Sequence, residues 1–197
     1  MGIGKRLTPQ LRDFIEGQRL FFVATAAPGS RVNLSPKGMD SLRVITCERI
    51  VWMNLTGSGN ETAAHVAEDG RMTLMFCAFE DPPLILRVYG RARVLHPDDR
   101  GWEAGAGLFP PMAGQRNLFD LAIDQVQTSC GTGVPVMPIQ RERGPEDLLP
   151  YYEEMGPEGV ARYWRRKNRR SLDGRPTGIL PEERPTARRE PVGSGSP

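Results

Sequence analysis

The 197-residue sequence predicts a mainly β protein with peripheral helices, in which short antiparallel strands form a small barrel. Short apolar or alternating stretches recur with turn-forming residues between them, as in hairpin-connected strands. Only one short stretch of helical composition interrupts these strands, whereas a doubly wound parallel sheet needs a helix after nearly every strand. The longest strand-like stretch has a glycine near its centre, where barrels often bend.

The first third of the chain predicts one helix and two hairpins. Leu11, Phe14 and Ile15 have helical spacing and predict a helix over residues 8–18. The first hairpin has the turn cluster Pro28-Gly29-Ser30 between its arms, and the second turns around Cys47-Glu48-Arg49. The four predicted strands span residues 20–26, 32–35, 42–46 and 50–55.

The middle of the chain predicts another short helix and three longer strands. Residues 61–68 have helix-forming composition and end before Gly70. The strands are expected over residues 71–79, 84–95 and 118–129. Nearly every residue of the first of these is apolar, so we expect both of its faces to be buried. In the second, Gly90 predicts a bulge or bend.

Composition divides the chain into one core and three appendages. Two helices are expected late in the chain, over residues 146–155 and 158–170. After residue 180 the chain is rich in proline, glycine and serine, and its few apolar groups cannot offset the entropy of ordering. The predicted parts are an N-terminal helix (1–19), a barrel core (20–135), C-terminal helices (136–180) and a disordered tail (181–197).

The net charge of +2 conceals an uneven distribution. Residues 160–197 hold ten basic and four acidic residues, a balance of +6, which leaves −4 for residues 1–159. A basic stretch over residues 162–170 fits nucleic-acid binding. It fits better a helix whose cations complement its dipole and face an acidic neighbour on this chain or another. Nucleic acid is therefore not the expected partner.

Several classes of protein are excluded by composition. No apolar run approaches the ~20 residues of a membrane span, and the first residues lack the apolar core of a secretory signal. The cysteines, Cys47, Cys77 and Cys130, show no CxxC spacing, and the two histidines, His65 and His96, lie far apart. We therefore expect a cytoplasmic protein with reduced thiols, no membrane association and no metal site.

The segment LTGSGNETAAH, residues 55–65, is the clearest candidate binding site. Its glycines allow a ligand to approach the backbone, and the first amides of the following helix can bind an anion. Ser58 and Glu61 have the spacing of a capping box. The glycines are not followed by the Gly-Lys-Ser/Thr of a P-loop. Both a phosphate pocket and an ordinary capped helix fit this pattern.

Other candidates depend on single side chains. Lys37, in NLSPKG, or Arg43 can supply the positive charge that a phosphate requires, and either can equally be a solvent-facing residue. Cys130 is either a reactive thiol or part of a structural turn, and the turn is favoured because no histidine is near in sequence. His65 is expected to be a packing or surface residue rather than a base.

Five segments taken together resemble a known family. They are FVATA (22–26), NLSPKG (33–38), IVWMNLTGSGNET (50–62), GRMTLMF (70–76) and LRVYGRARV (86–94). In this order they resemble the pyridoxamine 5′-phosphate oxidase-like, FMN-binding split barrels, and within them a branch with SPKG and LTGSGNET motifs. The resemblance covers residues 20–95 well, and more loosely residues 129–131 and 167–174.

The resemblance implies a split β-barrel that forms a homodimer, with FMN held between the subunits. Carried over by position, the cofactor-binding residues are Lys37, Arg43, Leu55, Thr56, Asn60, Glu61 and Thr62. Leu55 and Thr56 are expected to act through their backbones. Oxidases of the family have a basic pair where this chain has Glu61 and Thr62, and their vitamin-binding residues have no counterpart here.

The function implied by the resemblance is that of an FMN-dependent oxidoreductase, with a small-molecule substrate that the sequence does not identify. The flavin ring carries out the redox chemistry, so few acid–base side chains are needed and no catalytic residue is predicted. The alternative is a split barrel that binds a flavin, haem or deazaflavin without turnover. Haem would require an axial ligand from one of few candidate side chains.

Overall fold

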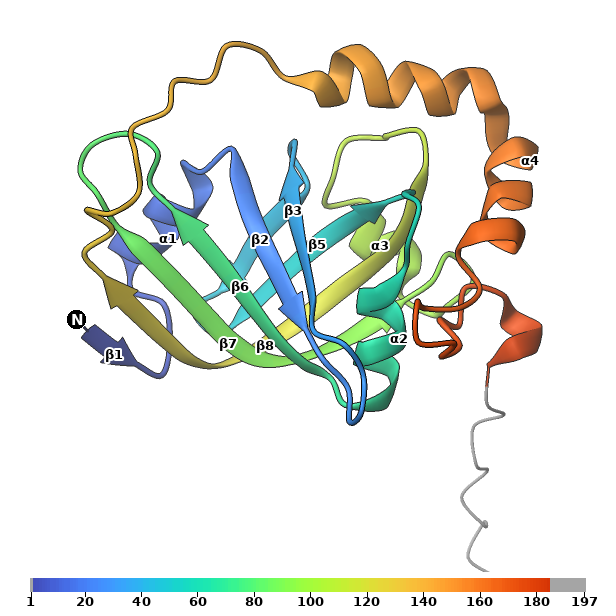
Figure 1. The fold of residues 1–197 in the computed structure, drawn as a ribbon, viewed down its shortest axis with the longest axis horizontal. Coiled ribbons are helices and arrows are strands. Elements are labelled where there is room, and N and C mark those ends of the chain that lie inside the picture. The colour runs from blue at the N-terminus through green and yellow to red at the C-terminus, as the bar shows by residue number, and fades with distance from the viewer. Residues whose placement is uncertain (1, 185–197) are drawn as a thin grey trace, which may run out of the picture.

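A computed structural model describes residues 2–184, which form one antiparallel sheet curled into a half-barrel (Figure 1). The strands are hydrogen-bonded in the order β3-β2-β6-β7-β8-β5-β4, and β1 pairs with β8. Their bounds are β1 Gly2–Gly4, β2 Leu20–Thr25, β3 Asn33–Gly38, β4 Leu42–Thr46, β5 Arg49–Leu55, β6 Arg71–Cys77, β7 Ile85–Leu95 and β8 Gln115–Ser129.

The sheet does not close on itself within the described residues. The hydrogen-bonded order ends at β3 on one side and β4 on the other, and these two strands do not pair. The barrel predicted from the strand pattern is therefore open on one side, and the split barrel implied by the resemblance is confirmed. Strand pattern predicts pairing but carries no information on whether the last two edges meet. The open edge matters because β3, together with the end of β5, lines the candidate site.

The buried residues form a large cluster on one face of the sheet and a smaller one on the other. The large cluster has an aromatic centre. Trp52 stacks on Phe119 with ring centroids 4.5 Å apart, and Phe21 meets Trp52 edge-on at 6.0 Å. On β6 only alternate residues are buried within this cluster, while Thr73 and Met75 are half-buried on the other face. The expected burial of both faces of this strand is thus correct for one face only.

The bulge predicted at Gly90 is confirmed. The register between β7 and β8 shifts between Tyr89 and Gly90. A Cβ atom at Gly90 would lie 2.0 Å from the carbonyl oxygen of Ala122, so only glycine allows the two strands to approach this closely.

The two early helices lie where the sequence predicts them. Helix α1 spans Pro9–Glu16 and is capped by Thr8, whose hydroxyl accepts from the Leu11 amide, and α2 spans Glu61–Glu68. A short helix, α3 (Trp102–Ala106), and strand β1 were not predicted. With three residues, β1 is too short to show a period.

The chain after β8 passes over the open end of the half-barrel and descends along its side (Figure 1). A single π-helical turn, Gly144–Leu148, leads into α4, Leu149–Lys167. Gly156 has φ 65° and ψ 167° and is followed by Pro157, so α4 consists of two helical halves, close to the two helices predicted. A 3₁₀ turn at Pro181–Glu183 follows, and the rest of the predicted tail, 185–197, lies outside the described residues.

A membrane span would need a long apolar helix, and none of the helices between residues 2 and 184 has that character.

Candidate functional site

A cavity of about 430 Å³ lies between β3 and the end of β5. This volume is typical of small-molecule sites. Strand β3, the end of β5, the loop after β5 and the first turn of α2 form most of the wall. Among the polar lining residues are Asn33, Ser35, Lys37, Ser41, Asn54, Thr56, Ser58, Asn60, Glu61, Thr62 and Arg116.

The structure brings six of the seven predicted cofactor-binding residues to this wall. They are Lys37, Leu55, Thr56, Asn60, Glu61 and Thr62. Arg43 is not among the lining residues. Its guanidinium pairs with Asp40 at 2.7 Å, donates to the Leu108 carbonyl at 3.0 Å and lies over the Phe109 ring. Of the two cations considered for a phosphate, only Lys37 reaches the cavity.

The Thr56 backbone is already used within the protein. Its amide donates to the Gly114 carbonyl at 2.7 Å, and its carbonyl accepts from the Tyr152 hydroxyl at 2.8 Å. Thr56 therefore shapes the wall. Its backbone amide is not free to make the contact with the cofactor that the resemblance implies.

Lys37 is the cation of the β3 wall. Its Nζ donates to Asn54 Oδ1 at 3.1 Å and lies 5.6 Å from the Trp52 ring centroid. Burial, together with the positive charge of Arg116, lowers the pKa of Lys37 to about 8. Lys37 is thus mostly charged at neutral pH, although its pKa lies close to that pH. A bound anion would stabilise the charge.

Three buried asparagines connect Lys37 to the start of α2. Since Nζ can only donate, Asn54 must turn its oxygen to Lys37, and its Nδ2 then donates to Asn117 Oδ1 at 2.9 Å. Asn117 Nδ2 in turn donates to Asn60 Oδ1 at 3.3 Å. Asn60 is 2% exposed, and its Nδ2 has no partner. The series therefore ends in a buried donor that lacks an acceptor.

Arg116 is a second cation at the cavity and is only 2% exposed. Its Nη1 donates to the Gly59 carbonyl and to Asn168 Oδ1, both at 2.8 Å, and to the Gly57 carbonyl at 3.3 Å. Its Nε has no partner, and no carboxylate contacts it in the described part of the chain. Burial lowers the pKa of Arg116 to about 10, so it stays charged at neutral pH.

The predicted capping box does not form. The N-cap of α2 is Asn60, without a side-chain bond, and Glu61 instead accepts the Leu172 amide with both oxygens, at 2.9 and 3.0 Å. Within residues 2–184, no acceptor is found for the backbone amides of residues 57–63. A run of free amides at a helix N-terminus attracts anions.

Four residues of the site were missing from the sequence candidates: Asn54, Arg116, Asn117 and Asn168. A weak signal exists for the first three, since each is a polar residue within or beside an apolar strand segment, where burial of polar side chains is unusual. No comparable signal marks Asn168, which lies in a run of basic residues.

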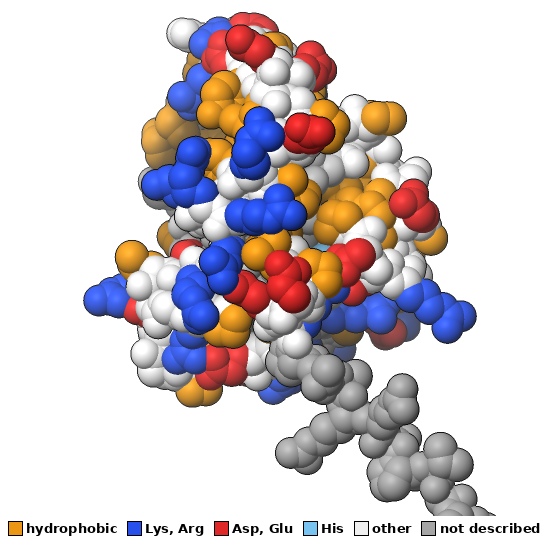
Figure 2. Space-filling model, turned by 90° about the vertical axis from the view of Figure 1, so that its right-hand side faces the viewer, with side chains coloured by type: hydrophobic (Ala, Val, Ile, Leu, Met, Phe, Trp, Pro, Cys, Tyr) orange, Lys and Arg blue, Asp and Glu red, His pale blue; other side chains and the backbone are white. Residues whose placement is uncertain are grey.

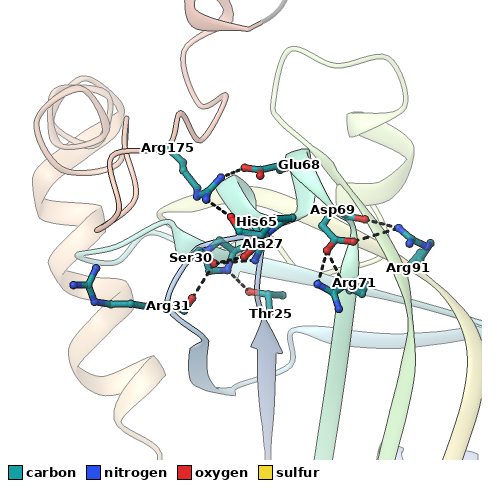
Figure 3. A network of polar contacts seen from close by, with 11 residues as sticks. Thr25, Ala27, Ser30, Arg31, His65, Glu68, Asp69, Arg71, Arg91 and Arg175 are labelled. Atoms are coloured by element: carbon teal, nitrogen blue, oxygen red, sulfur yellow. Dashed lines mark hydrogen bonds and ion pairs between the residues drawn. The ribbon is translucent and has the colours of Figure 1, made fainter.

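The other two single candidates lie away from this cavity. His65 is buried, and its Nδ1 is 3.1 Å from Thr25 Oγ1 (Figure 3). Cys130 is an exposed thiol 3.4 Å from Thr132 Oγ1, and hydrogen bonding to Thr132 lowers its pKa. It precedes Gly131 with φ 73°, which agrees with the favoured interpretation of a turn.

The network around the β2–β3 turn holds the end of the described chain against α2 (Figure 3). Arg175 forms an ion pair with Glu68 and donates to the Pro28 carbonyl. On the other side of α2, Asp69 pairs with Arg71. The contacts of Arg175 thus hold the C-terminal segment against the end of α2 and the β2–β3 turn.

Basic side chains gather at the end of α4, on the face shown in Figure 2. A hollow of about 260 Å³ there is lined by Arg165, Arg166, Lys167, Arg169 and Arg170. Part of the predicted pairing with acidic neighbours is present, because Arg169 pairs with Glu183 and Arg162 with Glu158.

Comparisons with known proteins agree with this architecture. A family model described as pyridoxamine 5′-phosphate oxidase matches residues 7–130. The chain is 33% identical over 187 residues to the "Pyridoxamine 5′-phosphate oxidase family protein ustO" of Aspergillus flavus, covering 86% of this chain and 75% of that protein.

Two solved structures share the fold at low identity. HupZ of Group A Streptococcus aligns with a TM-score of 0.53 and 18% identity over 63% of this chain and 94% of its own. A putative pyridoxamine 5′-phosphate oxidase of Lactobacillus delbrueckii aligns with a TM-score of 0.50 and 21% identity over 63% and 99%. The sequence match, the family model and the split-barrel fold show that this chain belongs to the pyridoxamine 5′-phosphate oxidase family.

Proposed function

We propose that this protein is an FMN-binding oxidoreductase that holds the cofactor's phosphate in the cavity between β3 and the start of α2. One observation carries the proposal: unsatisfied donors and positive charge meet in that cavity. Lys37 and Arg116 supply the charge, and Asn60 Nδ2 with the amides of residues 57–63 supplies donors that lack acceptors. Of these donors, Asn60 Nδ2 is buried. A buried donor left unpaired costs about 1–3 kcal/mol, which a bound acceptor would recover.

The residues present fit a phosphate monoester even without the family's basic pair. A phosphate dianion needs cations as well as amides. Lys37 and Arg116 provide two, and Glu61, the one carboxylate in the described lining, is engaged by the Leu172 amide. The Thr62 hydroxyl accepts from Asn33 Nδ2 at 3.1 Å, which leaves its own proton free to donate.

When bound, FMN would supply hydride or electron transfer. The residues of this chain bind and orient the cofactor. Neither His65 nor His96 belongs to the described lining, so a haem in this cavity would lack a histidine ligand.

We also propose that the protein is a homodimer with the cavity at the subunit interface. Strand β3 is an edge strand beside the cavity, and Leu34 on it and Val32 before it are 63% and 75% exposed. Exposed edges with apolar side chains are typical of association surfaces. Light scattering on the purified protein should give twice the chain mass of 21.9 kDa, and a monomer would refute this arrangement.

The test of the function is spectroscopic. Purified protein should bind FMN and show flavin absorption, and the bound flavin should be reduced anaerobically by NADH or NADPH and reoxidised by a substrate found in a screen. Failure to bind FMN would eliminate the proposal. Binding without any reduction would support the alternative, a flavin carrier without turnover.

A further inference from the structure

We propose that Asn168 is a positioning residue that, together with Arg116, turns the backbone amides of the loop before α2 toward the phosphate. The inference rests on the proposed function for the identity of the ligand. Its geometry rests on the hydrogen bonds that Tyr152, Asn168 and Arg116 make to the loop, residues 56–60.

Three carbonyls of this loop are bonded by side chains from other parts of the chain. The Thr56 carbonyl accepts from Tyr152 at 2.8 Å, and the Gly57 carbonyl accepts from Asn168 Nδ2 at 2.9 Å. The Gly59 carbonyl accepts from Arg116 at 2.8 Å. Tyr152 and Asn168 are not among the residues that line the cavity, so α4 lies behind the loop.

Peptide planarity converts these bonds into an orientation for the amides. In a trans peptide, the carbonyl of one residue and the amide of the next point in opposite directions. Because the Gly57 carbonyl is held by Asn168, which is not a lining residue, the amide of Ser58 faces the other way, toward the cavity that Ser58 lines. The bond from Arg116 to the Gly59 carbonyl fixes the next free peptide, whose amide belongs to Asn60. Without the outer bonds, glycines at positions 57 and 59 could rotate these peptides freely.

Asn168 links Arg116 to the Gly57 carbonyl. It is 0% exposed, its Oδ1 accepts from Arg116 and its Nδ2 donates to Gly57, so both ends of the amide are used. Its carbonyl accepts from the Thr177 hydroxyl, which fixes the end of α4 in place. Asn168 thus acts on the ligand only through the loop and through Arg116.

Affinities for FMN and for riboflavin, which lacks the phosphate, test this role. Asn168→Ala should weaken FMN binding about tenfold, the effect of losing one or two oriented donors, and change riboflavin binding less than about twofold. Lys167→Ala, the neighbouring exposed cation, is the control and should change neither affinity by more than about twofold. An Asn168→Ala protein that binds FMN like the wild type, or that loses both ligands equally, would overturn the inference.

A second measurement needs no variant and no flavin. In wild-type protein, inorganic phosphate should shift the amide NMR signals of Ser58 and Asn60 more than those of Gly133, which lies outside the cavity. If FMN does not bind but phosphate shifts these amides, the proposed function fails and the orientation of the loop stands. If phosphate leaves both amides unshifted, the inference is wrong.

Discussion

The curled sheet and the C-terminal segment are held in place by different interactions. The sheet has continuous strand ladders and an aromatic core in which Trp52 and Phe119 are fully buried. The C-terminal segment instead contacts the loop after β5 through hydrogen bonds from three single side chains. These are Tyr152 and Trp164 of α4, and Asn168 directly after it. The difference indicates that apolar burial sets the fold, while a few long-range hydrogen bonds set the geometry of the binding site.

The largest expected effect comes from crowding the sheet. Gly90→Ala would place a Cβ 2.0 Å from the Ala122 carbonyl oxygen and force two strands apart. We expect a loss of more than about 3 kcal/mol in the free energy of unfolding, measured in urea. Gly133→Ala, where nothing lies within 4 Å of the added atom, should change it by less than about 0.5 kcal/mol. Equal stabilities of the two variants would contradict the close approach of β7 and β8 at Gly90.

A somewhat smaller loss of folding stability is expected at acidic pH, and it comes from His96. Burial, then the charge of Arg184, lowers the pKa of His96 to about 4. The unfolded state, with a pKa near 6.5, therefore binds a proton that the folded state does not, and stability falls as the pH drops from about 6.5 to 4.

His96→Leu isolates this contribution from the carboxylates that also titrate there. In urea unfolding at pH 7 and pH 4.5, the wild type should lose about 2 kcal/mol more than the variant. The same acid sensitivity in both proteins would show that His96 does not titrate as described.

At the cavity, the expected effect is a pH-dependent affinity. Lys37 loses its proton above about pH 8, where a phosphate monoester is already a dianion. FMN affinity should therefore fall up to about tenfold per pH unit above pH 8, whereas riboflavin affinity should not. Lys37→Met should abolish the slope in fluorescence titrations. If the FMN affinity of this variant still falls above pH 8, a group other than Lys37 causes the pH dependence.

The smallest expected effect is on a single contact of α4. Trp164→Phe keeps an aromatic ring but loses the bond from Nε1 to Thr56 Oγ1 at 2.8 Å. The Thr56 hydroxyl still donates to the Gly114 carbonyl, so we expect a loss of only about 1 kcal/mol by thermal unfolding. A loss as large as that of Gly90→Ala would mean that the C-terminal segment supports the sheet itself.

The sequence predicted the sheet better than the site, for a physical reason. Apolar alternation and the glycine at position 90 are local signals of strands and bulges. The capping box failed because the Leu172 amide, more than a hundred residues later, binds Glu61. Arg43 and Lys37 looked equivalent in sequence, and the direction of each side chain relative to the sheet separates them. Arg116 and Asn168 meet only in three dimensions, so no spacing pattern could pair them.

The most direct test of the phosphate site compares FMN with riboflavin in three proteins. The wild type should bind FMN at least about tenfold more tightly than riboflavin. Lys37→Ala should lose most of this preference, and Arg43→Ala, whose side chain lies outside the cavity, should retain it. Equal affinities of the wild type for the two ligands, or equal losses in the two variants, would contradict the account.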